Sequence, residues 1–178
     1  MKRLKVTGKE LALLCGMAAL GTLTLPLGAA ARTVDSVTAT AGSTAEIVYS
    51  GETLTVTNGV ESTGNNATGI RAVDDTEVAI GKDIYVHGAN SQYNNSYGVY
   101  GDSGVQVKVG TDIVVESDAG AERVRGIYID GGYGSSISST PDIQVGGNIS
   151  ASGINTIGIY VSGKNANIKV AVSYTHLT

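Results

Sequence analysis

The sequence predicts an all-β protein whose repeats form a parallel β-helix, and three observations lead to this fold class. After residue 31, short segments alternate apolar and polar side chains and are separated by Gly, Asn or Asp, a pattern typical of strands. A glycine followed by Ile or Val recurs at positions 69, 98, 126 and 158, with spacings of 29, 28 and 32 residues, and such a period indicates a repeat architecture. All 14 Ile and 19 of the 20 Val also follow residue 31, and β-branched side chains pack well on a pleated sheet.

Residues 1–31 have the three-part layout of a secretory signal peptide. The basic residues come first, 8 of the 10 Leu precede residue 28, and Ala29-Ala30-Ala31 supplies an A-x-A site, so we expect cleavage after Ala31. An uncleaved membrane anchor is the alternative, although the apolar run is about the minimum that spans a bilayer and is interrupted by Gly, Pro and Thr. Cys15 follows Leu14 rather than the small residue that a lipoprotein site requires, so we assign it to the discarded signal.

The chain from Arg32 onward contains no cysteine, 8 basic and 15 acidic side chains, and therefore a formal net charge of −7. Its stability must come from packing and backbone pairing, because disulfides are excluded. An acidic chain of this kind cannot neutralise phosphates, so nucleic acid is excluded as a partner.

Residues 32–67 are assigned to N-terminal lead-in strands and residues 68–172 to about four coils of the β-helix. A helical repeat is excluded because no 3.6-residue periodicity follows residue 31. A propeller blade needs four strands in roughly 40–45 residues, whereas each unit here has three short strands in about 29 residues. Three strands form one coil, and stacked coils bury a continuous core.

Alternation assigns the faces of the repeated strand. The equivalent residues Ile70, Val99, Ile127 and Ile159 should point inward, as should the residues two positions further on, Ala72, Gly101, Ile129 and Val161. The intervening side chains should point outward, and they are Arg71, Tyr100, Tyr128 and Tyr160. Asp83, Asp112 and Asn148 also align and should lie at one corner of each coil, where an Asx side chain can bond the local backbone.

Tyr100, Tyr128 and Tyr160 are the candidate binding residues. Stacked coils would place these rings in an exposed ladder about one strand spacing apart, and a row of amphipathic rings can serve as a platform for a ligand or receptor. The alternative is that the rings stack on one another only to stabilise neighbouring coils.

Other motifs point more weakly to chemistry. Gly101-Asp102-Ser103-Gly104 matches the sequence around the nucleophilic serine of chymotrypsin-like proteases. A catalytic triad also needs a histidine base and an orienting acid. His87 is the one plausible base, and it lies only 16 residues upstream of Ser103, which leaves no room for the two barrels of that fold. The acidic residues Asp74, Asp75, Glu77 and Asp83 could hold a cation, yet Asp83 recurs as Asp112 and so indicates a corner residue. Residues 131–137 partly match the pattern of a calcium-binding nonapeptide, but Ser136 stands where that pattern has an aspartate, so the carboxylate ligand is missing. We expect no catalytic residue, no metal and no cofactor.

The repeat unit, Gly-Ile-x-Val, a variable turn and then Val-x-Val-Gly-x-Asp-Ile-x-Val, is written most clearly by Gly98-Val99-Tyr100 and residues 107–115. Behind a signal peptide and without cysteine, this pattern resembles the passenger region of autotransporters, the pertactin-like adhesins of Gram-negative bacteria. The resemblance covers about residues 37–172 and is strongest over residues 68–170. It implies a right-handed β-helix and a non-enzymatic role in adhesion or as a structural stalk.

The resemblance also implies display at the cell surface, with an outer-membrane barrel in the full-length protein and a host-cell or matrix receptor or a glycan as partner. The chain departs from the family because it has few coils and no barrel, so we expect an N-terminal fragment. Residues 173–178 break the pattern and are interpreted as a non-native tail; a genuine terminal strand is the alternative. Two other functions stay open, a fragment of a secreted β-helix enzyme that degrades polysaccharide and a filament-like structural protein.

Overall fold

The computed structural model describes residues 30–89, 95–121, 123–131, 140–162 and 165–171. The predicted signal peptide up to Ala29, the nonapeptide-like segment from residue 132 onward and the predicted tail lie outside the described residues. The described part of the chain consists of sixteen strands joined by turns. No helix in it has the length and apolar character that crossing a membrane requires.

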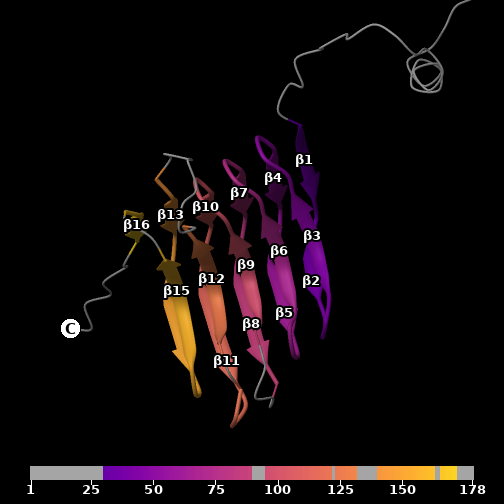
Figure 1. Cartoon of the computed structure of the whole chain (residues 1–178), viewed down its shortest axis with the longest axis vertical. Helices are drawn as coiled ribbons and strands as arrows, with labels where there is room; N and C mark the ends of the chain where they lie inside the picture. Colours follow the sequence, from indigo (N-terminus) through magenta and orange to yellow (C-terminus); the bar gives the residue numbers. More distant parts are fainter. Residues whose placement is uncertain (1–29, 90–94, 122, 132–139, 163–164, 172–178) are drawn as a thin grey trace, which may run out of the picture.

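The strands form three parallel sheets, here named A, B and C (Figure 1). Sheet A contains β1 (Ala31–Val34), β4 (Thr53–Val56), β7 (Glu77–Ile80), β10 (Gln106–Val109), β13 (Asp142–Val145) and β16 (Asn167–Val170). Sheet B contains β2 (Val37–Ala39), β5 (Val60–Thr63), β8 (Ile84–Gly88), β11 (Ile113–Ser117) and β14 (Ile149–Ser152). Sheet C contains β3 (Thr44–Val48), β6 (Thr68–Ala72), β9 (Tyr97–Gly101), β12 (Val124–Asp130) and β15 (Thr156–Ser162).

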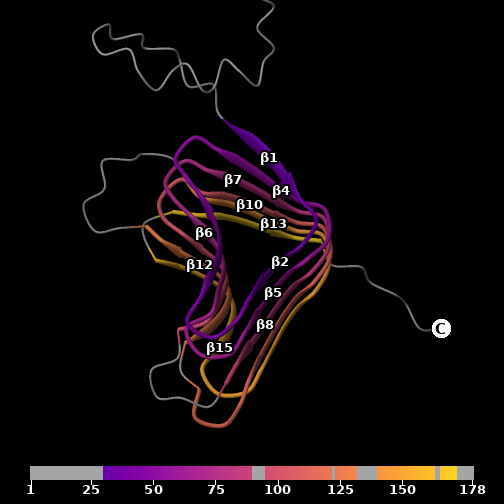
Figure 2. The same cartoon turned by 90° about the vertical axis from the view of Figure 1, so that its right-hand side faces the viewer.

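Each coil contributes one strand to each sheet, and every strand pairs in parallel with the equivalent strand of the next coil. Viewed along the stack in Figure 2, the labelled strands fall on three sides around a common interior. The fold is therefore a right-handed parallel β-helix, which confirms the predicted fold class.

The β-helix begins closer to the N-terminus than the repeat pattern of the sequence indicates. Strands β1 to β5, within the segment assigned to lead-in strands, belong to the same three sheets, so the described residues form five complete coils followed by β16. Two features hide the first coils from sequence comparison. The register steps from Ala31 to Thr53 and from Thr53 to Glu77 are 22 and 24 residues, shorter than the 29 from Glu77 to Gln106. In addition, Glu46 stands opposite Ile70 at a position that is apolar in the later coils.

The core is aliphatic. Every buried hydrophobic side chain of the described residues is Leu, Ile, Val or Ala, and the predicted inward residues Ile70, Val99 and Ile127 are fully buried. Ile159, in the last complete coil, is partly buried because no described strand of sheet C covers β15. Branched aliphatic side chains fill the narrow space between three sheets without the volume that an aromatic ring would need.

One column of glycines brings sheets B and C close together. Gly69, Gly98, Gly126 and Gly158 each precede the inward Ile or Val, and both residues of each pair face the interior or its edge, so the strict alternation is interrupted at this point. A Cβ atom on Gly98 would lie 2.3 Å from Cγ2 of Ile84 and 2.7 Å from the carbonyl oxygen of Gly126. The neighbouring strands stay in register on both sides of this position, and glycine marks a close approach of backbone and side chain.

The corner between sheets A and B is held by bonds between coils. The backbone N–H of Asp112 donates to Oδ1 of Asp83 at 3.0 Å, and the Thr111 hydroxyl donates to the same oxygen. One coil further, the N–H of Asn148 donates to Oδ1 of Asp112 at 2.6 Å. The expectation that these side chains bond their local turn is corrected here. Stacking places the amide of the following coil one strand spacing away, where the carboxylate reaches it.

These hydrogen bonds make the stability of the corner dependent on pH. The Thr111 hydroxyl and the Asp112 amide hold the pKa of Asp83 below its ordinary value. A carboxyl group with a depressed pKa stabilises the folded state above its unfolded pKa of about 4 and loses this contribution as the pH falls.

We therefore expect the thermal midpoint of the wild-type protein to decrease more steeply between about pH 5 and pH 2 than that of Asp83→Asn. Asparagine keeps the Oδ1 acceptor without a titrating charge, and Asn148 occupies the equivalent corner. Thermal unfolding followed by circular dichroism at several pH values checks this. If the thermal midpoints of the two proteins decreased equally with pH, the carboxylate of Asp83 would not be a source of the pH-dependent stability.

Candidate binding surface on sheet C

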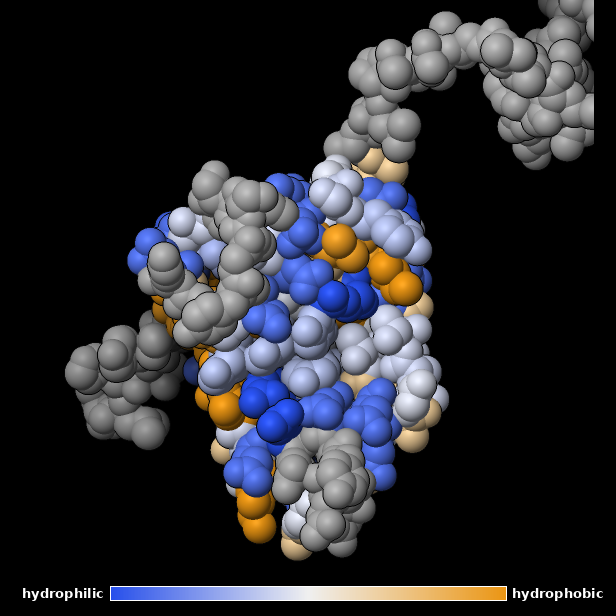
Figure 3. Space-filling view, viewed as in Figure 1, coloured by the Kyte–Doolittle hydropathy of each residue, from blue (hydrophilic) through white to orange (hydrophobic). Residues whose placement is uncertain are grey.

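The outer face of sheet C collects the aromatic side chains. Two outward columns cross its strands, and four of the six tyrosines among the described residues lie in them. The first column contains Thr68, Tyr97, Arg125 and Ile157, and the second contains Ile47, Arg71, Tyr100, Tyr128 and Tyr160. Figure 3 looks onto this side of the molecule, where weakly and strongly hydrophilic side chains form most of the surface.

The three candidate tyrosines stack as a ladder. The ring centroids of Tyr100 and Tyr128 are 5.1 Å apart, and those of Tyr128 and Tyr160 are 5.3 Å apart with the rings 9° from parallel. These distances follow from the register, because parallel strands lie about 4.8 Å apart and the three residues are direct partners. The rings shield one another, so Tyr100 and Tyr128 are partly buried, whereas Tyr160 at the end of the ladder is 40% exposed.

Tyr97 and Arg125 complete the surface, and both were missed by the sequence analysis. The Tyr97 ring lies 5.1 Å from Tyr100 in an edge-on contact and 5.4 Å from Tyr128. Strict alternation from the inward Val99 would have placed Tyr97 inside. The shift at Gly98 turns it outward, so the glycine before the inward residue was the available signal.

Two guanidinium groups lie against the rings. The Cζ atom of Arg71 is 4.1 Å from the Tyr100 centroid, and its Nη2 donates to Asp102 at 2.8 Å. The Cζ atom of Arg125 is 5.0 Å from the centroids of both Tyr128 and Tyr160. Cation–π contacts of this kind hold the long Arg side chains against the rings.

The electrostatics of this face differ from those of the whole chain. Desolvation raises the pKa of Tyr97 and of Tyr100, so both hydroxyls stay protonated beyond the range of an ordinary tyrosine. Arg71 pairs with the carboxylate of Asp102, and the charges of Arg71 and Arg125 are matched in number by those of Asp102, which follows β9, and Asp130, which ends β12. The face is therefore close to neutral, although the chain from Arg32 onward carries a net charge of −7.

This arrangement is suited to binding rather than to covalent chemistry. It offers phenol hydroxyls, ring edges and guanidinium groups on a regular support, and the outer face of the terminal Tyr160 ring. The ring faces inside the ladder are already in contact with one another, so a ligand must approach across their edges or at Tyr160.

The residues considered for catalysis are engaged separately. Asp102 accepts from Arg71 on sheet C, whereas Nε2 of His87 lies 3.2 Å from Oδ1 of Asp118 at the end of sheet B. Ser103 is buried. Among the acidic residues considered for a cation, Asp83 lies at the A–B corner and Glu77 begins β7. In the described ranges, no group of three or more His, Cys, Asp or Glu side chains could hold a metal ion.

Comparison of the chain with protein-family models, with curated proteins and with solved structures finds no match.

The ring contacts of the ladder are expected to stabilise the fold. The Tyr128 ring contacts the rings of Tyr97, Tyr100 and Tyr160, so we expect Tyr128→Ala to lower the free energy of unfolding by about 2 kcal/mol, from three lost ring contacts and their buried area. Tyr49→Ala is the matched control, because this side chain is 60% exposed, and it should cost less than about 0.5 kcal/mol. Urea unfolding measures both. Equal effects would show that the rings do not support one another.

Proposed function

We propose that this protein is an exported, non-enzymatic passenger region of the autotransporter type, whose β-helix presents the outer face of sheet C to a partner. One observation carries the binding role. All the buried hydrophobic side chains of the described residues are aliphatic, while four tyrosines and two arginines gather on the exterior of one sheet.

The composition of this face supports a protein or glycan partner. Aromatic residues bury large areas when they enter a core, so placing them outside gives up part of the stability that they could provide. Tyr and Arg are also enriched among the residues that dominate binding energy. A rigid support lowers the cost of ordering such side chains on binding.

Export and surface display are supported by the layout of residues 1–31 and by the resemblance of the repeat to autotransporter passengers. In a full-length protein of this kind, an outer-membrane barrel would carry the β-helix to the cell surface. The partner would then be a receptor or glycan on a host cell or in its matrix. A non-enzymatic role is favoured because Asp102 and His87, the residues with catalytic potential, each hold a separate structural contact.

The test compares adhesion of beads coated with the exported protein to epithelial cells and to immobilised matrix proteins and glycans. We expect the wild type to bind, and the combined change Tyr160→Ser and Arg125→Gln to weaken binding at least about tenfold, as expected when central Tyr and Arg residues are lost. Tyr85→Ser, on the outer face of sheet B, is the control and should bind like the wild type.

Two results would contradict the proposal. Absence of binding by the wild type, or equal binding by the sheet C variant, would remove the adhesive role. Release of reducing ends from a polysaccharide by the wild type would favour the alternative of a polysaccharide-degrading enzyme. N-terminal sequencing of the exported protein tests the signal, with a start at Arg32 as the expected result.

A further inference from the structure

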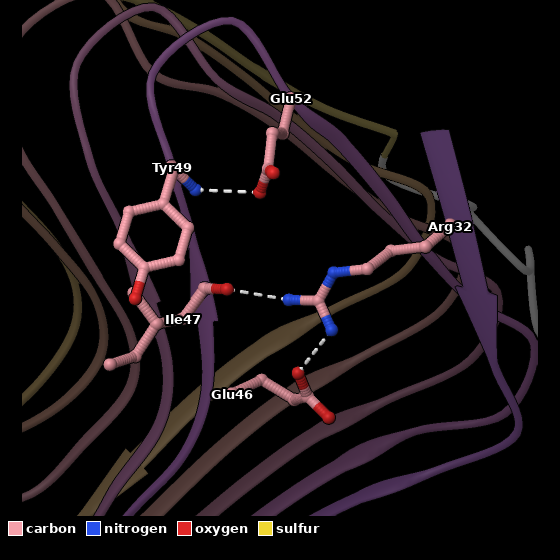
Figure 4. A network of polar contacts seen from close by, with 5 residues as sticks. All are labelled: Arg32, Glu46, Ile47, Tyr49 and Glu52. Atoms are coloured by element: carbon pink, nitrogen blue, oxygen red, sulfur yellow. Dashed lines mark hydrogen bonds and ion pairs between the residues drawn. The ribbon is translucent and has the colours of Figure 1, made fainter. Parts of the chain in front are cut away.

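Two arginines at one end of sheet C differ from the other arginines of the described residues, because they have no carboxylate partner. Arg32 is paired at 2.6 Å with a glutamate of β3, as Figure 4 shows, and Arg71 is paired with Asp102 at 2.8 Å. Arg123 and Arg125 hold no ion pair with a carboxylate of the described residues. From Arg32 onward the chain has 15 acidic and 8 basic side chains, so two neighbouring guanidinium groups without a carboxylate need an explanation.

Arg123 occupies a backbone position that suits asparagine better than arginine. It lies at the corner between sheets B and C, directly before β12, and its φ is 56°. The register of sheet C makes Asn66 and Asn155 its equivalents in two other coils, and each has a φ of 55°. Asparagine adopts this left-handed conformation more readily than a residue with a long side chain. A strained residue of this kind suggests a function for its side chain.

Both guanidinium groups lie near the hydroxyl of Tyr97. Desolvation raises the pKa of this hydroxyl, and the positive charges of Arg125 and Arg123 oppose the increase. The Cζ atom of Arg125 lies 6.0 Å from the ring centroid of Tyr97 and 5.0 Å from that of Tyr128, and its Nε atom is buried without a hydrogen-bond partner. Arg123 is exposed. Two positive charges, one held against the rings and one exposed to solvent, therefore gather around a single phenol.

The acidic side chains of this face lie at its other end. Asp102 follows β9 and Asp130 ends β12, whereas Arg123 precedes β12 and Arg125 is its second residue. Five residues of strand separate Arg125 from Asp130, which is about 16 Å. The outward column that contains Arg125 has no acidic residue. The positive end therefore keeps its charge and can attract an anionic group, although the chain as a whole is acidic.

We propose that Arg123, Arg125 and Tyr97 form a subsite for the carboxylate of an acidic glycan, which a sialic acid or a uronic acid would supply. The inference rests on the binding role proposed for sheet C and names its ligand chemistry. A guanidinium group matches a carboxylate through two parallel hydrogen bonds, and the phenol hydroxyl adds a further donor.

The rest of the face suits a sugar better than a peptide. A pyranose ring carries its carboxylate beside hydroxyl groups and C–H faces, and these match the hydroxyls and ring edges of the tyrosine ladder. The ring is also rigid, whereas an acidic peptide must lose the conformational freedom of its chain when it binds.

Binding of the exported protein to immobilised hyaluronan and to 3′-sialyllactose tests the subsite. Carboxyl-reduced hyaluronan and lactose are the matched neutral probes. We expect at least one acidic probe to bind at least about tenfold more tightly than its neutral counterpart, and this binding should weaken as the salt concentration increases. Comparison of the two acidic probes shows whether the uronic acid or the sialic acid is preferred.

Arg123→Asn is the most informative variant, because it removes one charge and introduces the residue that Asn66 and Asn155 provide at equivalent corners. It should weaken binding to the acidic probe at least about tenfold. Its thermal midpoint should stay unchanged or increase, since the backbone strain is relieved. Lys108→Asn removes the same charge from an exposed position on the outer face of sheet A and should bind like the wild type.

Several results would overturn the subsite. They are equal binding to acidic and neutral probes, binding to the acidic probes that Arg123→Asn leaves unchanged, and tighter binding to poly-L-glutamate that depends on Arg123, which would assign an acidic peptide instead. A wild type that adheres to cells or matrix through sheet C, but to neither acidic probe, would overturn the subsite and leave the adhesive role intact. A wild type that binds no cell, matrix protein or glycan would remove both.

Discussion

Gly98→Ala is expected to lower the free energy of unfolding by about 3 kcal/mol, at the upper end of the usual cost of overpacking a core. The added Cβ would lie 2.3 Å from Cγ2 of Ile84 and 2.7 Å from the carbonyl oxygen of Gly126. The second contact is with the backbone of the next coil, which cannot move away without loosening the parallel pairing of β9 and β12.

Gly101→Ala, three residues further along the same strand, is the matched control. Its Cβ would approach Cδ1 of Ile129 at 2.6 Å, the mobile end of a side chain, and the same column already holds Ala72. We expect a cost below about 1 kcal/mol, since a rotamer change relieves the contact. Chemical denaturation of the two variants measures the difference, and equal costs would contradict the close approach of sheets B and C at Gly98.

Ile143→Ala should have the larger effect of the two predictions, about 4 kcal/mol, within the range measured for buried Ile or Leu truncations. Ile143 is fully buried in sheet A between β10 and β16. The coils above and below it cannot collapse into the cavity without breaking register.

Ile168→Ala provides the control in the same column, one coil further on. This residue is 48% exposed, so its truncation removes less buried area and leaves no enclosed cavity. We expect a cost below about 1.5 kcal/mol. Similar losses for the two variants in urea unfolding would mean that Ile143 is no more tightly packed than the half-exposed Ile168.

Much of the repeated strand could be predicted from the sequence because local pattern determines it. The column of Ile70, Val99 and Ile127, and the outward tyrosines beside it, follow from a period of about 29 residues and from strand alternation. The parallel stacking then follows, since each coil can bury its apolar face only against another coil.

The parts that were missed depend on contacts between coils. Arg32 and Glu46 interrupt the apolar columns, so the first coil does not show the repeat in the sequence. In the structure the two side chains form a hydrogen bond between β1 and β3. Tyr97 faces outward because of the shift at Gly98, which alternation alone does not reveal. The bond from the Asp112 amide to Asp83 joins residues 29 positions apart, and only the register of the coils brings them together.

The central claim is that each coil contributes one residue to each column, in register, because both the core and the tyrosine ladder depend on it. The chain from Arg32 onward lacks cysteine, so a disulfide between two introduced cysteines tests this register directly. Thr55 and Ala79 are outward partners on adjacent strands of sheet A, and a spacing of about 4.8 Å lies within the Cα range of a disulfide.

We expect Thr55→Cys with Ala79→Cys to form an intramolecular disulfide on mild oxidation, detected by mass and by loss of free thiols. Thr55→Cys with Lys108→Cys joins strands two coils apart, about 10 Å from each other, and should stay reduced. A disulfide in the second pair and none in the first would contradict the stacked register.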